Sequence, residues 1–288
     1  MRLRFKGYVF LFVIVIGIFF SIYYYMSLKT DKRKKDLNYN ISVLVQTGPK
    51  KEALKSVYLE EILELSIDKP SNFFNFDEKK AQLKLLSNPL IKDAFVKKIK
   101  PNTIYVDYSI QTPIAKFLDF NNIAIDETGS CFPFFPFYSP KNLPEIYLND
   151  ENIDPNKLFA KAIKTEKVDL ALYLLKLLNN YDKSSFEIKR IDLSNVDSKS
   201  YGKKEIVIFL DHILKININS KIYTLIFPRI LRLNPDSFEE QMGNYFNLNS
   251  KMLDDYKKQI RLDDSFPLMS VFGKKIVDLR IEKMAFID

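Results

Sequence analysis

Residues 94–110 have the sequence AFVKKIKPNTIYVDYSI, and its pattern predicts a β-hairpin. From Ile104 to Ile110 every second side chain is apolar or aromatic and faces the same side of an extended chain, a period of two that is typical of strands. The run at 94–99 leads into residues 100–102, where proline and asparagine favour a turn. We therefore expect two antiparallel strands joined at this turn.

The residues before the hairpin predict one strand and two helices. An apolar run at 41–45 is followed by turn residues and favours a strand. Apolar residues recur through 57–65, ahead of a proline, and favour a helix with a broad apolar face. Residues 77–86 favour a second helix, because Asp77 is a suitable N-cap. The expected order over residues 41–112 is therefore strand, helix, helix, strand, strand.

A second domain is expected over residues 113–288. Four prolines from Pro133 to Pro144 exclude a helix in that stretch. A helical region is expected after Asp154, since it is a capping residue followed by a first-turn proline. We expect a mostly antiparallel β domain with flanking helices, which places the chain in the α+β class. Its strand patterns lie at 186–193, 206–210, 214–218, 222–227, 271, 275–279 and 285–287, and a polar helix is expected at 236–259.

Residues 7–28 contain no charged side chain, and no comparable run occurs later in the chain. A helix over 8–28 would be about 31 Å long, which matches the hydrocarbon thickness of a bilayer. Its far end at 22–26 is bulky and aromatic, unlike the small residues at a signal-peptide cleavage site. We therefore expect an uncleaved transmembrane helix at 8–28, with a tail at 1–7 and a linker at 29–40, rather than a cleaved signal or a buried core helix.

Most of the formal net charge of +8 lies beside this apolar segment. Residues 1–35 hold eight basic residues and one acidic residue, a net charge of +7, and leave +1 for residues 36–288. A nearly neutral body argues against a nucleic-acid partner. The basic run at 32–35 is expected to meet anionic lipid headgroups of the membrane. Three basic residues precede the apolar segment and five follow it, and this count alone favours a cytoplasmic body.

Residues that commonly carry catalysis or bind metal are scarce. His212 and Cys131 are the only histidine and cysteine, so an ordinary zinc site cannot form. His212 falls between two predicted strands and is expected in a turn, which disfavours a Ser-His-Asp triad; Cys131 is expected to be a small apolar filler. No two of the seven glycines have the spacing of a nucleotide-binding motif. The pairs Asp254-Asp255 and Asp263-Asp264 are expected on solvated faces. We predict no enzymatic activity, no cofactor and no metal.

Several spaced motifs together resemble one bacterial family. The motifs LxxPxIxxAxV at 86–96, KPxTIxV at 100–106 and PIA at 113–115 resemble the POTRA domain of the cell-division protein family FtsQ, also called DivIB. Further motifs look like the family's β domain: IDxxG at 125–129, LPEI at 143–146 and VDLR at 277–280. The chain departs from the family pattern at Ile110 and Gln111, where an acidic and a basic residue are usual. The chain thus resembles a diverged member with a POTRA domain at 41–112 and a β domain at 113–288.

This resemblance implies a scaffold rather than an enzyme. It implies a cytoplasmic N-terminal tail, a single span of the cytoplasmic membrane and an extracytoplasmic body at the division septum, against the charge count. The implied partners are small bitopic proteins of the FtsB/DivIC and FtsL types, and through them the FtsW/FtsI-type septal peptidoglycan synthase. The implied partner-binding residues follow the VDLR motif on an edge strand: Arg280, Ile281, Lys283, Phe286 and Ile287. An alternating apolar pattern would equally allow Phe286 and Ile287 to close the β core.

Two other functions compete with the scaffold. A POTRA-containing module for assembly or transport of envelope proteins would usually bring repeated POTRA units or a β-barrel, and the sequence offers no sign of either. A membrane-tethered hydrolase of wall polymer would require a nucleophile or a metal site, and no convincing one is found. The binding scaffold is therefore the leading expectation.

Overall fold

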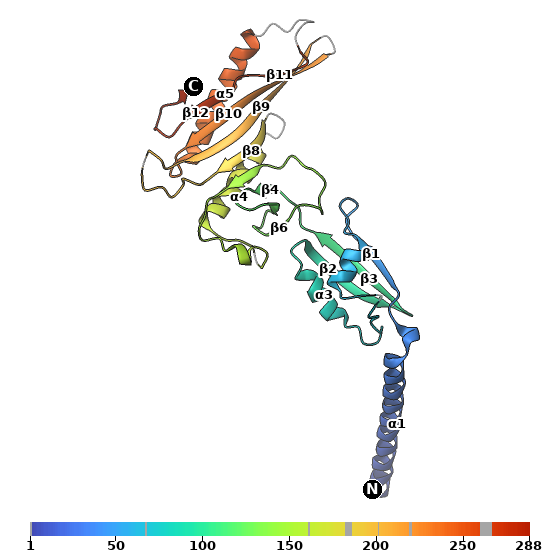
Figure 1. Cartoon of the computed structure of the whole chain (residues 1–288). Coiled ribbons are helices and arrows are strands. Elements are labelled where there is room, and N and C mark those ends of the chain that lie inside the picture. The colour runs from blue at the N-terminus through green and yellow to red at the C-terminus, as the bar shows by residue number, and fades with distance from the viewer. Residues whose placement is uncertain are drawn as a thin grey trace. The chain divides into compact units, whose positions relative to one another are not determined.

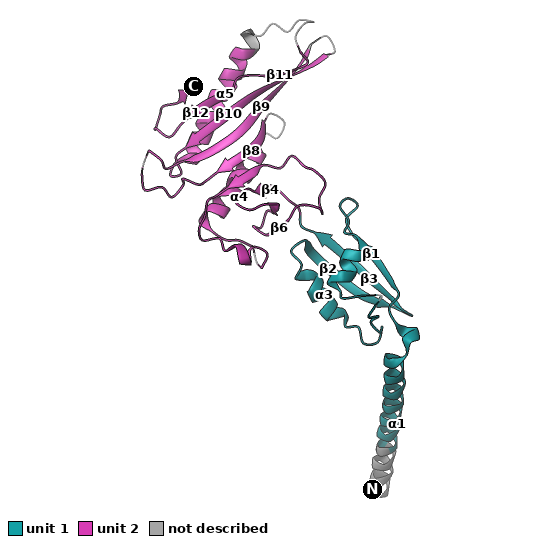
Figure 2. Ribbon diagram, in the orientation of Figure 1, with its two compact units in different colours: residues 1–111 teal, residues 112–288 magenta. Residues whose placement is uncertain are grey.

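The computed structural model describes residues 2–66, 68–160, 162–181, 186–200, 202–218, 221–259 and 267–288. The chain divides into two compact units, residues 1–111 and 112–288 (Figure 2). The predicted pair Asp263-Asp264 lies outside the described residues. The two units are described separately below.

Unit 1 begins with the long helix α1 (Arg2–Lys35), followed by the 3-10 helix η1 (Leu37–Tyr39) (Figure 1). Among the described residues, no helix is long and apolar enough to cross a bilayer. The side chains of residues 1–11 and 13, which include the start of the predicted span at 8–28, lie outside the described part of the structure. Helix α1 continues into the predicted linker at 29–40 as far as Lys35. Lysine and arginine are good helix formers, and their charges favour the C-terminal end of a helix.

The rest of unit 1 is a three-stranded sheet with two helices. Its strands β1 (Val43–Thr47), β2 (Ile91–Ile99) and β3 (Thr103–Ile110) have the order β1-β3-β2, with β1 parallel and β2 antiparallel to β3. The hairpin predicted around residues 100–102 is therefore confirmed. Helices α2 (Ser56–Ile62) and α3 (Glu78–Leu86) each place a leucine in the core.

Local signals explain where these two helices begin and end. The carboxylate of Asp77 accepts hydrogen bonds from the backbone N–H groups of Lys79 and Lys80, as its predicted N-cap role requires. Helix α2 ends at Ile62, earlier than the pattern over 57–65 predicts. The backbone of Glu64 has a φ of 54°, a left-handed conformation that a helix cannot continue through.

Unit 2 contains one large mixed sheet. Helix α4 (Glu166–Tyr181) connects β7 to β8, and helix α5 (Phe238–Gln259) connects β10 to β11. Its strand order is β13-β12-β10-β9-β8-β7-β4-β5-β6, and β11 pairs with β10 beside this path. As predicted, most of the described strand pairs in unit 2 are antiparallel, but β4–β7, β7–β8, β10–β11 and β10–β12 are parallel pairs, so the sheet is mixed. Parallel neighbours require a crossover, and α4 and α5 provide it before β8 and after β10. The strands are β4 (Ala115–Phe117), β5 (Ile123–Ile125), β6 (Cys131–Pro133), β7 (Glu145–Tyr147), β8 (Phe186–Asp192), β9 (Ile206–Ile218), β10 (Lys221–Leu233), β11 (Met269–Val271), β12 (Lys275–Asp278) and β13 (Phe286–Ile287), and a 3-10 helix η2 (Pro155–Lys157) precedes α4.

His212 lies inside β9 and not in a turn. The two strands predicted at 206–210 and 214–218 are one continuous strand that pairs with β10 along its length. His212 is buried, with Nε2 2.7 Å from the Tyr245 hydroxyl and Nδ1 3.0 Å from the Asn249 amide nitrogen. Both partners come from α5, so tertiary hydrogen bonds satisfy a polar side chain that local sequence placed in a turn. Burial raises the pKa of Tyr245, which keeps its hydroxyl protonated.

The other motif residues of unit 2 have structural roles. Cys131 is buried in the core, where desolvation and then the charge of Asp126 raise the pKa of its thiol to about 12. The IDxxG motif forms a tight turn, in which the Asp126 carboxylate accepts hydrogen bonds of 2.8 Å from the backbone N–H groups of Thr128 and Ser130. Gly129 has a φ of +86°, and a Cβ there would lie 2.7 Å from a backbone oxygen. The turn therefore requires glycine.

Candidate partner-binding edge

Strand β13 (Phe286–Ile287) is the terminal strand of the unit 2 sheet. It pairs antiparallel with β12, with Val277 opposite Ile287. The next pair along, Ile276 and Asp288, exchanges two backbone hydrogen bonds of 3.2 and 3.1 Å. Hydrogen-bonded and non-hydrogen-bonded pairs alternate in an antiparallel ladder, so the N–H and C=O of Ile287 point away from β12. This edge therefore presents backbone groups that another strand can pair with.

The side chains on this edge are apolar and accessible. Phe286 is 55% exposed and Ile287 is 41% exposed. In the chain alone, neither side chain is buried in the β core, which is the position that the alternative interpretation gives them. Because neighbouring side chains of a strand point to opposite faces, Phe286 and Ile287 contact different faces of the sheet.

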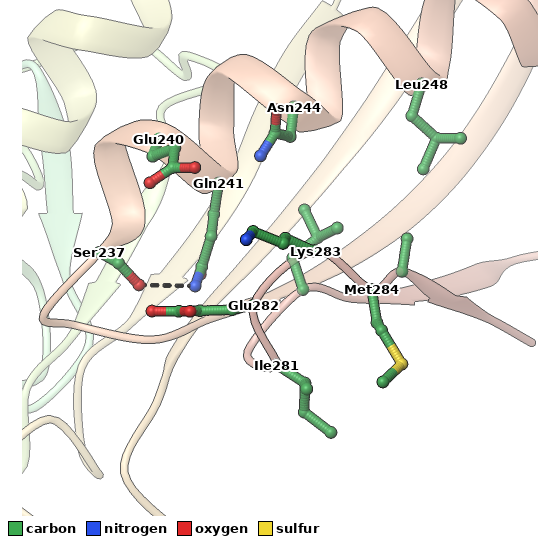
Figure 3. Close-up of a pocket in the computed structure, with 11 residues that line it drawn as sticks. Ser237, Glu240, Gln241, Asn244, Leu248, Ile281, Glu282, Lys283 and Met284 are labelled. Carbon is green, nitrogen blue, oxygen red and sulfur yellow. Dashed lines mark hydrogen bonds between the residues drawn. The ribbon is translucent and has the colours of Figure 1, made fainter.

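A cavity of about 530 Å³ lies beside the edge, between α5 and the loop at 279–285. Ile281 and Met284 extend away from α5 in the close-up of this cavity (Figure 3), and both are about half exposed. Lys283 has a φ of 58° in the turn where the Met284 N–H donates to the Ile281 carbonyl. The cavity is lined by Ser237, Glu240, Gln241, Asn244, Leu248, Leu279, Ile281, Glu282, Lys283, Met284 and Ala285.

Arg280 lies apart from these residues, in a cluster of four charges. Its Nη2 is 2.7 Å from Asp278 and its Nη1 is 3.2 Å from Glu205, while Arg232 lies 2.7 Å from Glu205 and 3.4 Å from Asp278. The Arg280 Nη1 also donates to the carbonyl of Gly202 at 2.9 Å. The Arg280 side chain is only 19% exposed. Its geometry is that of a residue that positions the edge.

The electrostatics of the cluster favour its charged form. Burial alone would raise the pKa of Asp278, but the hydrogen bonds from Arg280 and the charges of Arg280 and Arg232 together outweigh it and lower the pKa. The pKa of Arg280 is raised, chiefly by its hydrogen bond to Asp278. The VDLR motif thus connects the edge through opposite charges to Arg232 of β10 and to Glu205, which immediately precedes β9.

The predicted site residues therefore fall into three places. Ile281 and Lys283 line the cavity, Phe286 and Ile287 form the edge strand, and Arg280 belongs to the charge cluster. The sequence did not point to the cavity residues of α5, because their contact with 279–285 comes from the tertiary fold. Within the described part of the chain, no group of three or more His, Cys, Asp or Glu side chains could hold a metal ion.

A comparison with protein families identifies the first domain. Residues 53–107 match the family described as POTRA domain, FtsQ-type. The matched stretch contains α2, α3, β2 and most of β3. No curated protein matches the chain. The chain thus carries a POTRA domain of the FtsQ type, which supports the family resemblance predicted from the sequence.

Proposed function

We propose that this chain is a membrane-anchored scaffold of bacterial cell division that binds a partner protein by adding the partner's strand to β13. Its FtsQ-type POTRA domain suggests a POTRA protein related to cell division and is consistent with protein–protein interaction. The observation that carries the proposal is the edge itself, where Ile287 directs its N–H and C=O away from β12. Unpaired strand edges are used for recognition by strand addition.

The surroundings of β13 support this mode of binding. A partner strand would gain affinity from main-chain hydrogen bonds and selectivity from side chains that alternate between the two faces of the sheet. Phe286 and Ile287 offer apolar contacts, one on each face. The cavity beside the edge offers Ile281 and Met284 to residues of the partner that extend past its strand. Such apolar anchors beside a paired backbone commonly supply most of the binding energy.

The proposed location is the cytoplasmic membrane, with the N-terminus in the cytoplasm and the body outside it. Residues 8–28 would form the single span, and the large apolar side chains from Ile14 to Leu28 are exposed on α1. The partners would be small bitopic proteins of the FtsB/DivIC and FtsL types, and through them the FtsW/FtsI-type synthase. In this role the chain performs no chemistry and controls septal peptidoglycan synthesis by holding its partners together.

The edge is tested by removing one outward N–H. Ile287→Pro deletes that donor, while the bonds between Ile276 and Asp288 remain available. Full-length chain co-expressed with its FtsB/DivIC-type and FtsL-type partners should lose co-purification in this variant. Ile287→Val keeps the N–H and is the matched control, which should bind as the native chain does. Native binding by Ile287→Pro, with an unchanged thermal midpoint, would contradict the assigned edge.

The cellular role is tested by depletion. Loss of a division scaffold should give filamentous or enlarged undivided cells. Normal division combined with a defect in envelope protein assembly would instead support the competing assembly or transport function.

A further inference from the structure

The C-terminal end of α1 is fastened to the POTRA domain by two asparagine side chains. The Asn72 amide nitrogen lies 3.0 Å from the carbonyl oxygen of Arg33 and 3.1 Å from that of Asp36. The Asn75 amide nitrogen lies 3.4 Å from the carbonyl of Lys34. Carbonyls in the last turn of a helix have no partner within it, so these amides act as a C-cap supplied by the domain. The end of α1 and the loop at 72–76 are therefore held together.

A cavity of about 560 Å³ lies at this junction and is rich in cations. Helix α1 contributes Lys34 and Lys35, and α3 contributes Lys80 and Lys84. The carboxylates that line the same cavity are Glu64 and Asp77. Four cations therefore line the cavity with two anions, and Lys34 also pairs with Asp31 at 3.4 Å on α1. The four cations come from two separate elements, α1 and α3.

Both carboxylates are already engaged. Glu64 pairs with Lys84 at 2.5 Å, and a hydrogen bond from that lysine lowers the pKa of Glu64. Asp77 caps α3 through two backbone N–H groups. Among the described residues, neither Lys35 nor Lys80 has its ammonium group within 4 Å of a carboxylate, and the charge of Lys80 adds a smaller contribution to the lowered pKa of Glu64. The cavity thus holds cationic groups that an external anion can pair with.

We propose that this cavity binds the phosphate of an anionic phospholipid headgroup. The inference rests on the membrane anchor of the proposed function. Lys35 lies seven residues beyond Leu28, about 10 Å along a helix, and a lysine side chain can reach back toward the headgroup layer. Leu37, which also lines the cavity, is 77% exposed and can enter the boundary between headgroups and acyl chains. Lysines near an anionic membrane surface attract its lipids.

The consequence is a lipid site that forms only when the POTRA domain is docked on its anchor helix. A phosphate between Lys35 and Lys80 would connect the end of α1 to α3. The bound lipid would then strengthen the same junction that Asn72 and Asn75 hold by hydrogen bonds.

The test uses the full-length chain in nanodiscs of phosphatidylcholine with and without phosphatidylglycerol. Native mass spectrometry of the released protein measures which lipid it retains. The native chain should retain phosphatidylglycerol in preference, and Lys35→Gln/Lys80→Gln should lower this preference on the order of tenfold, since each lysine near the surface contributes to lipid attraction. Lys92→Gln/Lys97→Gln removes two exposed lysines of β2 outside the cavity and should retain the native preference. Equal retention by the native chain and the Lys35→Gln/Lys80→Gln variant would overturn the proposal.

Two further measurements identify the source of the phosphate and separate this inference from the anchor. Inorganic phosphate in millimolar excess should leave phosphatidylglycerol bound, and displacement by it would assign the cavity to a soluble anion and overturn the lipid. Alkaline carbonate extraction of membranes should leave the chain in the pellet. Extraction into the supernatant would contradict the anchor in the proposed function, whereas retention in the pellet without a preference for phosphatidylglycerol would contradict the lipid site alone.

Discussion

Replacing Arg280 by alanine should loosen the β12–β13 edge without unfolding the rest of unit 2. The change removes a guanidinium that lies 2.7 Å from Asp278 and 3.2 Å from Glu205, and a bond to the carbonyl of Gly202. Asp278 and Glu205 are then left with Arg232 as the remaining cation of the cluster.

The size of the effect follows from burial. The side chains of Asp278 and Glu205 are 19% and 11% exposed, between a surface pair and a buried one. Breaking a fully buried pair costs about 3–5 kcal/mol and a surface pair about 0–1 kcal/mol. Because Arg232 still compensates part of the charge, we expect a cost of about 2 kcal/mol, which corresponds to roughly 30-fold faster opening of the edge.

Native-state hydrogen exchange of the full-length chain in detergent measures this opening at the amides of Ile276 and Asp288, which pair across the edge. Arg190→Ala is the matched control, because Arg190 pairs with Glu145 at 2.6 Å but is 41% exposed. It should cost under about 1 kcal/mol and leave β12 unaffected. Unchanged exchange at Ile276 and Asp288 in the Arg280→Ala variant would refute the positioning role of Arg280.

Three further changes test the electrostatics of unit 2. The pKa of Asp278 is lowered in the fold, so its stabilising contribution is present above the unfolded pKa of about 4 and is lost as pH falls toward the lower folded pKa. Between pH 6 and pH 3 the thermal midpoint of Asp278→Asn should therefore fall less than that of the native chain. An equal fall in both would contradict this role of Asp278. Arg229 is 1% exposed, and its Nε and Nη2 have no hydrogen-bond partner among the described residues. Arg229→Met should therefore raise the free energy of unfolding by about 1–2 kcal/mol in urea, and a lower free energy of unfolding would show that the charge is compensated. Tyr245→Phe removes the partner of His212 Nε2 and should cost about 1–3 kcal/mol in the same assay; a neutral result would mean that this hydrogen bond contributes little.

The POTRA domain was predictable because its signals are local. The alternation after Ile104 and the turn at 100–102 specify the hairpin, and Asp77 caps α3 within its own first turn. The end of α2 was less predictable, because the residue with the left-handed conformation is Glu64 and not the glycine that usually marks such a position.

Unit 2 was harder to predict because its decisive contacts are distant in sequence. The partners of His212, Tyr245 and Asn249, lie on α5, more than thirty residues later in the sequence. Its sequence neighbours alone therefore suggested a turn. The parallel pairs could have been expected from the helices placed between strands, since such helices are typical crossovers.

The candidate site was only partly accessible to sequence reasoning. The VDLR motif pointed to residues 280–287, but not to how the structure distributes them among the charge cluster, the cavity and β13. Arg280 faces Glu205 and Arg232 through strand register, while the cavity at 279–285 depends on α5. These contacts are products of tertiary packing, and residue spacing alone does not encode them.

The central claim is that a partner strand pairs with β13, and the exchange rate of the Ile287 amide tests it most directly. In the chain alone this N–H points away from β12 and should exchange quickly. With the proposed FtsB/DivIC-type and FtsL-type partners bound in a shared nanodisc, amide-resolved hydrogen exchange should slow at Ile287 by at least about tenfold, as expected of a new ladder hydrogen bond. Exchange at Ile287 that stays unchanged while the partners remain bound would contradict strand addition at this edge.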